Sequence, residues 1–192
     1  MGSSPAFVTV VSGVPRSGTS MLMQMLRAGG FPVLTDGFRE PDPHNPRGYL
    51  EFEPARRLRR DTSWVGDAAG RAVKVVHALV RCLPAGQDYR VILIRRDLAE
   101  VVASQQAMLA DRSALGGGLS PERLAEIFEA QLRELEEWLG EQPRFRLLRL
   151  DHAQVLAEPE RVAGEISRFI GGGLDLEAMA AAVAPALHRQ RR

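Results

Sequence analysis

Residues 13–20 (Gly-Val-Pro-Arg-Ser-Gly-Thr-Ser) are the part of the chain whose residue types and spacing point most directly to a chemistry. They follow an apolar run rich in β-branched residues, 7–11, and precede a segment of helical character, 21–27. A strand, a glycine-containing turn and a helix start form a phosphate cradle, because backbone N–H groups and the positive end of the helix dipole point at one place. The sequence therefore predicts a phosphate-binding loop.

The spacing of this loop is that of the nucleotide-binding pattern Gly-x4-Gly-Lys-Ser/Thr, with Thr19 at the position where the pattern requires lysine. In that pattern the lysine reaches the β- and γ-phosphates. Its replacement argues against an ordinary ATP or GTP hydrolase or kinase. We expect a loop that binds phosphate but does not hold a γ-phosphoryl group in the usual way.

The elements that must position this loop alternate between strands and helices. The order strand, helix, strand, strand, helix, helix, strand, helix predicts an α/β fold. We expect a P-loop-type three-layer sandwich, in which a small, mostly parallel sheet carries helices on both faces. Strands are expected at 6–12, 72–76, 90–94 and 146–150, helices at 19–28, 53–61 and 175–184, and further helices that begin near residues 98, 121 and 159.

Several helix ends carry capping residues. Gly29-Gly30 should end the first helix. Asp97 is suited to cap a helix, with Glu100 three residues later completing a capping box, and Ser120-Pro121 combines a cap with proline at the first helical position. The four prolines of 31–50 predict a long surface loop, which at this length is usually functional or disordered.

Three chemically notable segments lie at the C-terminal ends of predicted strands: 13–20, 74–77 and Arg95-Arg96. In parallel α/β sheets, ligands bind beyond the carboxyl ends of the strands. These segments are therefore expected to form one site.

Two of the motifs resemble those of a known family. Residues 13–20 resemble the 5′-phosphosulfate loop of sulfotransferases, and their sequence is most similar to that of the tyrosylprotein branch and its bacterial relatives. Residues 96–104 resemble the family's 3′-phosphate segment, in which an arginine after a strand (Arg96) is followed eight residues later by a serine in the next helix (Ser104). The serine, two turns into the helix, can lean back toward the phosphate that the arginine binds.

Two further segments extend the resemblance over most of the chain. Residues 74–77, with Leu83-Pro84 further on, are similar to the Lys-Thr-His segment of cytosolic sulfotransferases, with one extra residue between lysine and histidine. The stretch from 156–159 to 187–189 resembles the ending of bacterial family members.

The resemblance implies a PAPS-dependent sulfotransferase, which moves a sulfuryl group from 3′-phosphoadenosine 5′-phosphosulfate (PAPS) to an acceptor oxygen or nitrogen and leaves 3′-phosphoadenosine 5′-phosphate (PAP). Such a transfer needs no metal, and no spacing of His, Asp or Glu suggests one. The implied donor-binding residues are Pro15, Arg16, Ser17, Gly18, Thr19, Ser20, Arg96 and Ser104.

In-line sulfuryl transfer depends mainly on positioning and on stabilising charge at the leaving oxygen. Arg16 is the candidate for stabilising the leaving phosphate. Lys74 is a candidate for reinforcing charge at the site, although a strand-end lysine that reaches solvent is as good an interpretation.

The acceptor must lose a proton, so a general base is expected. His77 is the candidate by its position and its titration range; the alternative is a structural histidine at a strand end. In the tyrosylprotein branch the base is a glutamate after the first helix. The comparable region here contains Asp36 and Glu40, so the base could lie there instead.

Other features have open interpretations. Trp64 could stack on adenine, but a place in the core or a surface groove is favoured. Met21 stands where cytosolic members have a tryptophan, so the adenine platform is unassigned. Residues 36–50 are a candidate acceptor-site lid or a connecting loop. The basic tail, 186–192, could fold onto the 3′-phosphate, but a disordered tail is favoured.

Composition limits the function classes. A length of 192 residues suits a single domain, and a net charge of +1 selects neither nucleic acid nor an anionic membrane. The one cysteine excludes an intrachain disulfide, and no apolar run reaches the length of a membrane helix. We expect a cytoplasmic enzyme with a small-molecule acceptor; neither the acceptor nor the oligomeric state can be read from the sequence.

Two other functions compete. A small-molecule kinase or other nucleotide phosphotransferase would need a phosphate-reaching lysine and a magnesium carboxylate, and Lys74, the only lysine, is outside the loop. A non-catalytic nucleotide-binding module would have kept the donor pocket alone; the short chain, with little length left for an acceptor domain, favours it to some extent.

Overall fold

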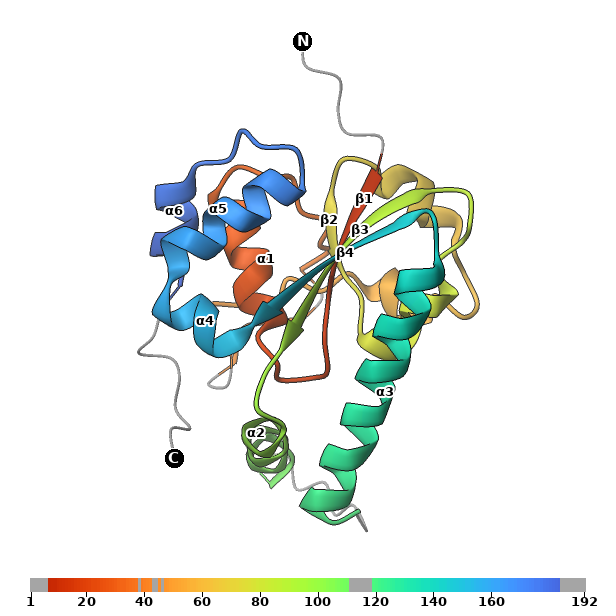
Figure 1. Cartoon of the computed structure of the whole chain (residues 1–192), viewed down its shortest axis with the longest axis vertical. Coiled ribbons are helices and arrows are strands. Elements are labelled where there is room, and N and C mark those ends of the chain that lie inside the picture. Colours follow the sequence, from red (N-terminus) through yellow and green to blue (C-terminus); the bar gives the residue numbers. More distant parts are fainter. Residues whose placement is uncertain (1–6, 38, 43–44, 46, 111–118, 184–192) are drawn as a thin grey trace.

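A four-stranded, all-parallel sheet forms the centre of the molecule (Figure 1). The computed structural model describes residues 7–37, 39–42, 45, 47–110 and 119–183. The strand order is β2-β1-β3-β4, with β1 in the middle beside β3. The strands are β1 (Phe7–Ser12), β2 (Ala72–Lys74), β3 (Asp88–Arg95) and β4 (Phe145–Asp151).

Helices cover both faces of this sheet, as predicted (Figure 1). One face carries α1 (Thr19–Ala28), α4 (His152–Ala157), α5 (Pro159–Phe169) and α6 (Leu176–Ala181). The other carries α3 (Pro121–Glu141) and the 3-10 helices η1 (Glu53–Arg57), η2 (Ser63–Ala68) and η3 (His77–Cys82). α2 (Leu98–Ala110) follows β3 and packs against α3. The three-layer α/β prediction is therefore confirmed.

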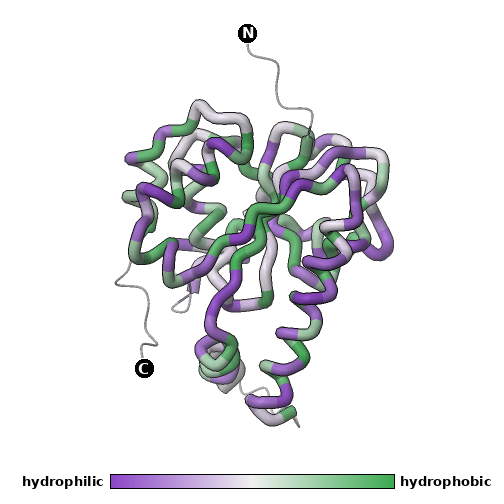
Figure 2. Tube along the Cα trace, viewed as in Figure 1, coloured by the Kyte–Doolittle hydropathy of each residue, from purple (hydrophilic) through white to green (hydrophobic). Residues whose placement is uncertain are grey.

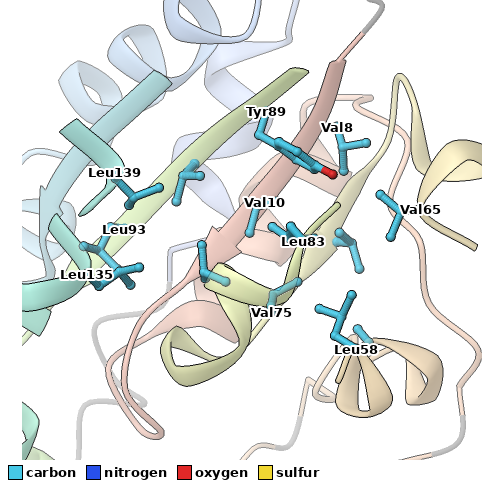
Figure 3. Close-up of a cluster of buried hydrophobic side chains, with 14 of the residues drawn as sticks. Val8, Val10, Leu58, Val65, Val75, Leu83, Tyr89, Leu93, Leu135 and Leu139 are labelled. Carbon is cyan, nitrogen blue, oxygen red and sulfur yellow. The ribbon is translucent and has the colours of Figure 1, made fainter. Parts of the chain in front are cut away.

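Two apolar cores lie on the two faces, because successive strand residues point to opposite sides. In β1, Val8 and Val10 face the core beneath α3, whereas Val11 faces the core beneath α1. Figure 3 shows the first core, where Leu93 of β3 lies beside Leu135 of α3 and Val10 of β1 lies near Leu83. Figure 2 shows the central strands as predominantly hydrophobic, with hydrophilic residues concentrated on the outer helices. Strands buried on both sides explain the continuous apolar runs in the sequence.

The predicted caps form where the sequence places them. Ser120 Oγ accepts from the backbone N–H of Arg123 at 3.2 Å, with Pro121 as the first residue of α3. Asp97 Oδ1 accepts from the N–H of Glu100 at 3.0 Å. α1 ends at Ala28, before Gly29 and the left-handed Gly30 (φ 84°). These local signals set the helix ends correctly.

Short elements differ from the predictions. The predicted helix over 53–61 is the single 3-10 helix η1, whose exposed Arg56 and Arg57 both pair with Glu53. η2, η3 and α4 were not predicted, because elements of six residues are too short to show a hydrophobic period. The end predicted for the last helix, residue 184, lies outside the described residues.

The segment 31–50 is a loop, as predicted, and its described residues form only the isolated bridges Val33–Ala72 and Asp42–Asn45. Within the described part of the chain, no helix is long and apolar enough to cross a membrane.

Candidate functional site

The loop between β1 and α1 makes a tight turn that requires both of its glycines. A Cβ on Gly13 would lie 2.4 Å from Ser17 Oγ and 2.8 Å from the backbone oxygen of Ile94. Gly18 has φ 110°, and its Cβ would lie 2.7 Å from Cδ2 of His152. The loop is therefore packed against the ends of β3 and β4, and glycine is needed for space as well as for conformation.

The loop also leaves the start of α1 open for an anion. Gly18 is the N-cap residue of α1 and makes no side-chain cap hydrogen bond. Arg16 has φ 73°, a left-handed conformation that a side chain adopts at a cost of about 1–3 kcal/mol and that is concentrated at functional sites. Backbone N–H groups at such a helix start attract phosphate. The geometry suits the predicted phosphate-binding loop, with Pro15 exposed at its tip and Thr19 and Ser20 in the first turn of α1.

The two predicted phosphate segments lie in direct contact. Nε of Arg16 donates to Ser104 Oγ at 3.0 Å, across from the loop to α2. Nη1 of Arg96 donates to the backbone oxygen of Arg16 at 3.1 Å. The structure therefore brings Arg16, Arg96 and Ser104 together beyond the carboxyl ends of β1 and β3.

The neighbouring arginine takes a different direction. Arg95 pairs with Glu129 at 2.5 Å and with Glu136 at 3.2 Å, both on α3. Arg96 instead pairs with Glu100 of α2 at 2.8 Å and stays beside the loop, with 11% of its side chain exposed. Arg95 is the last residue of β3 and Arg96 follows it, and because the two side chains point in different directions only Arg96 reaches the loop.

Lys74 is partly buried beside the first turn of α1. Its Nζ donates to Ser20 Oγ at 2.9 Å and to the backbone oxygen of Tyr49. Burial lowers the pKa of Lys74 to about 8, against the opposing effect of the Glu51 carboxylate. A lysine that is less than fully charged near neutral pH therefore joins β2 to the loop 31–50.

The loop 31–50 folds over the start of α1. Nδ2 of Asn45 donates to Ser20 Oγ at 2.9 Å, and Nε2 of Gln24 donates to the backbone oxygen of Gly48 at 3.2 Å. The Tyr49 hydroxyl donates to Asp42 at 2.8 Å, and the Arg39 guanidinium lies 3.3 Å from the centre of the Tyr49 ring. The segment 36–50, predicted as an acceptor-site lid or a connecting loop, thus contacts the predicted site through Asn45 and Tyr49.

His77 lies at the end of β2, against the other face of the sheet. Its N–H donates to the backbone oxygen of Gly13 at 3.2 Å, which joins it to the phosphate loop. Its Nε2 lies 2.8 Å from Oε1 of Gln131 on α3. The sequence did not single out Gln131, which is one of many polar residues along that helix.

Of the other two candidate bases, Asp36 makes a structural contact and Glu40 is exposed to solvent. Oδ2 of Asp36 accepts from the backbone N–H of Glu53 at 2.6 Å, at the start of η1. Glu40 is exposed. Trp64 is 8% exposed and packs edge-on against Phe52, with ring centres 5.2 Å apart, so it belongs to the core. The basic tail, 186–192, lies outside the described residues.

His152 is a residue at the site that the sequence analysis missed. It directly follows β4, is buried, and its ring packs against Gly18. The rule that strand ends converge would have found it, since β4 runs parallel to β3. No group of His, Cys, Asp or Glu within the described residues could hold a metal ion.

No protein-family model and no curated protein matches the sequence. Solved structures do match over nearly the whole chain. The sulfotransferase domain of the Synechococcus PCC 7002 olefin synthase is similar with a TM-score of 0.60 and 17% identity, over 98% of this chain and 81% of that one. A mouse sulfotransferase complexed with PAP is similar with a TM-score of 0.58 and 15% identity, over 93% of this chain and 63% of that one. A sulfotransferase from Mycobacterium tuberculosis is similar with a TM-score of 0.56 and 16% identity, over 97% of this chain and 74% of that one. The chain therefore has the P-loop α/β fold of the sulfotransferases.

Proposed function

We propose that this protein is a sulfotransferase that moves a sulfuryl group from PAPS to a hydroxyl or amine of a small-molecule acceptor. The observation that carries the proposal is the contact of Arg16 with Ser104 at 3.0 Å and with Arg96 at 3.1 Å. A donor with two separate phosphoryl groups needs two anion sites in one pocket. The loop amides and the Arg96–Ser104 pair meet that need.

The residues fit the donor in chemistry and space. The loop amides and Arg16 would hold the 5′-phosphosulfate, at a turn so close that a Cβ on Gly13 or Gly18 would meet neighbouring atoms. Arg96 and Ser104 would hold the 3′-phosphate by a charge-assisted contact, which separates this donor from ATP. Bound PAPS would supply the activated sulfuryl group.

The catalytic work of the protein would then be electrostatic and acid–base. Arg16 would stabilise the charge that develops on the leaving phosphate, because a guanidinium remains charged at any physiological pH. His77 would accept the proton from the acceptor. Lys74, at 2.9 Å from Ser20 Oγ, would reinforce the positive charge beside the loop when it is protonated.

A small acceptor agrees with what related folds bind. A retinol dehydratase similar to this chain, with a TM-score of 0.56, was solved with retinol and PAP, and one with a TM-score of 0.55 with androsterone and PAP. Those structures are 17% and 15% identical to this chain. Their ligands belong to those proteins, and they suggest small hydroxylated compounds as the first acceptors to test.

The decisive experiment compares binding of PAP with binding of ATP and magnesium by calorimetry. We expect PAP to bind, and ATP with magnesium not to bind. Arg96→Ala should weaken PAP binding about 10- to 100-fold, and Ser104→Ala by less, because hydrogen bonds to charged groups contribute about 1.5–3 kcal/mol each. Arg168→Ala is the matched control. Arg168 is exposed near the end of α5, beside Phe169, whose backbone oxygen accepts from Arg90 at the opposite end of β3.

Each alternative function has its own outcome in this experiment. Preference for ATP with magnesium would support a kinase or other phosphotransferase and reject the sulfotransferase. Binding of PAP without turnover of PAPS across phenols, alcohols and amines would favour a non-catalytic nucleotide-binding module.

A further inference from the structure

Helix α3 holds the His77 ring by two contacts from one face. Oε1 of Gln131 lies 2.8 Å from Nε2 of the ring. Phe128, three residues earlier on the same face of the helix, meets the ring edge-on, with centres 6.0 Å apart and planes at 89°. With its backbone bonded to Gly13, His77 is fixed in both position and ring orientation relative to the phosphate loop.

The contact with Gln131 also selects which ring nitrogen carries the proton. An amide oxygen can only accept, so Nε2 must donate, and in the neutral ring Nδ1 then keeps its lone pair. Nδ1 is buried and has no hydrogen-bond partner among the described residues. An unpaired buried polar atom costs about 1–3 kcal/mol, and a catalytic role is one of the reasons for which native proteins retain such an atom.

We propose that Gln131 is the positioning residue of His77, holding the ring hydrogen at Nε2 so that Nδ1 takes the acceptor's proton. The inference rests on the proposed sulfotransferase function. As the acceptor oxygen bonds to sulfur, its proton passes to Nδ1. The bond between sulfur and the 5′-phosphate oxygen breaks, and its electron pair stays on that oxygen. Gln131 continues to accept from Nε2–H in the resulting imidazolium.

The first test reads the ring hydrogen directly, by NMR of the full chain with isotope-labelled histidine. Spectra are recorded without ligand at about pH 8.5, above the ordinary titration range of imidazole, and His77→Gln identifies the signals. We expect the hydrogen of His77 on Nε2. Gln131→Met should abolish this preference, because methionine has a side chain of similar length and is a good helix former but has no acceptor oxygen. Gln131→Glu, which restores an acceptor oxygen, should retain it.

The second test measures turnover with PAPS in the same variants. Gln131→Met should lower kcat about tenfold or more, since general bases typically contribute 10²–10⁴-fold, while the Kd for PAP changes less than about twofold. Gln131→Glu should recover most of the loss. Gln87→Met is the matched control, because Gln87 directly precedes β3, at the opposite end of the sheet.

The outcomes separate the two proposals. A native His77 with its hydrogen on Nδ1, or a Gln131→Met ring with an unchanged hydrogen position, would overturn the assignment of Gln131 while PAP binding stands. Failure to bind PAP would reject the sulfotransferase function, whatever the ring hydrogen shows.

Discussion

Lys74 is the only lysine of the chain, and it lies partly buried where three segments of the site meet. Its Nζ bonds Ser20 of α1 and the backbone oxygen of Tyr49. Burial disfavours the ammonium form, and the positive charges of Arg39 and Arg16 add to this effect, while Glu51 opposes it. The pKa of Lys74, about 8, therefore belongs to a group that can change its charge within the range in which enzymes work.

The lowered pKa of Lys74 makes stability depend on pH in a definite direction. Between about 8 and the ordinary lysine pKa of 10.5, the unfolded chain binds more protons than the folded one, so the free energy of unfolding should rise with pH. We expect Lys74 to contribute a rise of about 2 kcal/mol from about pH 7 to 9.5, at about 1.4 kcal/mol per pKa unit. Urea unfolding of the native chain and of Lys74→Met at each pH measures it.

The comparison with Lys74→Met cancels other groups that titrate in this range. Burial raises the pKa values of Tyr49 and Tyr89, the latter to about 12, and these tyrosines lower stability only above the ordinary tyrosine pKa. Parallel stability curves for the native chain and Lys74→Met would contradict the prediction.

The elements that build the site act through their ends and edges. The β1–α1 loop supplies amides because Gly13 and Gly18 allow it to pack against β3 and His152. α3 acts along its length: Gln131 holds His77, while Glu129 and Glu136 hold Arg95 at the end of β3. A long helix packed on the sheet can therefore fix two strand ends at once.

Two glycines with positive φ allow the cost of the left-handed backbone to be separated from the cost of steric contact at the loop. Gly18 (φ 110°) has His152 where a Cβ would lie, whereas Gly30 (φ 84°) has open space there. Gly30→Ala should cost about 1 kcal/mol from the left-handed backbone alone. Gly18→Ala should cost more and should also abolish PAP binding, as measured by urea unfolding and calorimetry. Equal costs in the two variants would show that the contact with His152 is unimportant.

At the scale of the whole molecule, one sheet joins two apolar cores. The core beneath α1 contains Leu26, and the core beneath α3 contains Leu135, both buried. Neither core is complete without the strands, whose alternate side chains enter each. We propose that the chain folds as one unit, with the site at the carboxyl ends of the strands that both cores share.

The single-unit proposal predicts one cooperative unfolding transition for the native chain and for a variant in each core. Leu26→Ala and Leu135→Ala should each lower the free energy of unfolding by about 2–5 kcal/mol. Circular dichroism and tryptophan fluorescence, followed together in urea, should give coincident transitions. Separate transitions, with each variant shifting only one of them, would mean that the two faces unfold independently.

Much of the fold could be predicted because its signals are local. The apolar runs of β1 and β3, the Ser120 cap and the period of α3 each lie within a few residues of one another, and each formed as expected. Elements of six residues, such as η3 and α4, gave no such signal, since they are too short to repeat a pattern clearly.

The sequence by itself determined the α/β order, the helix ends and the glycine turn, because each depends on neighbouring residues. Only the tertiary structure decided that Arg95 pairs with Glu129 and Glu136 of α3, that Trp64 packs against Phe52 in the core and that Gln131 meets His77. These contacts join residues far apart in the chain. Which polar residue of α3 reaches a strand end depends on the rotation and offset of the helix on the sheet, and the packing of the whole core sets both.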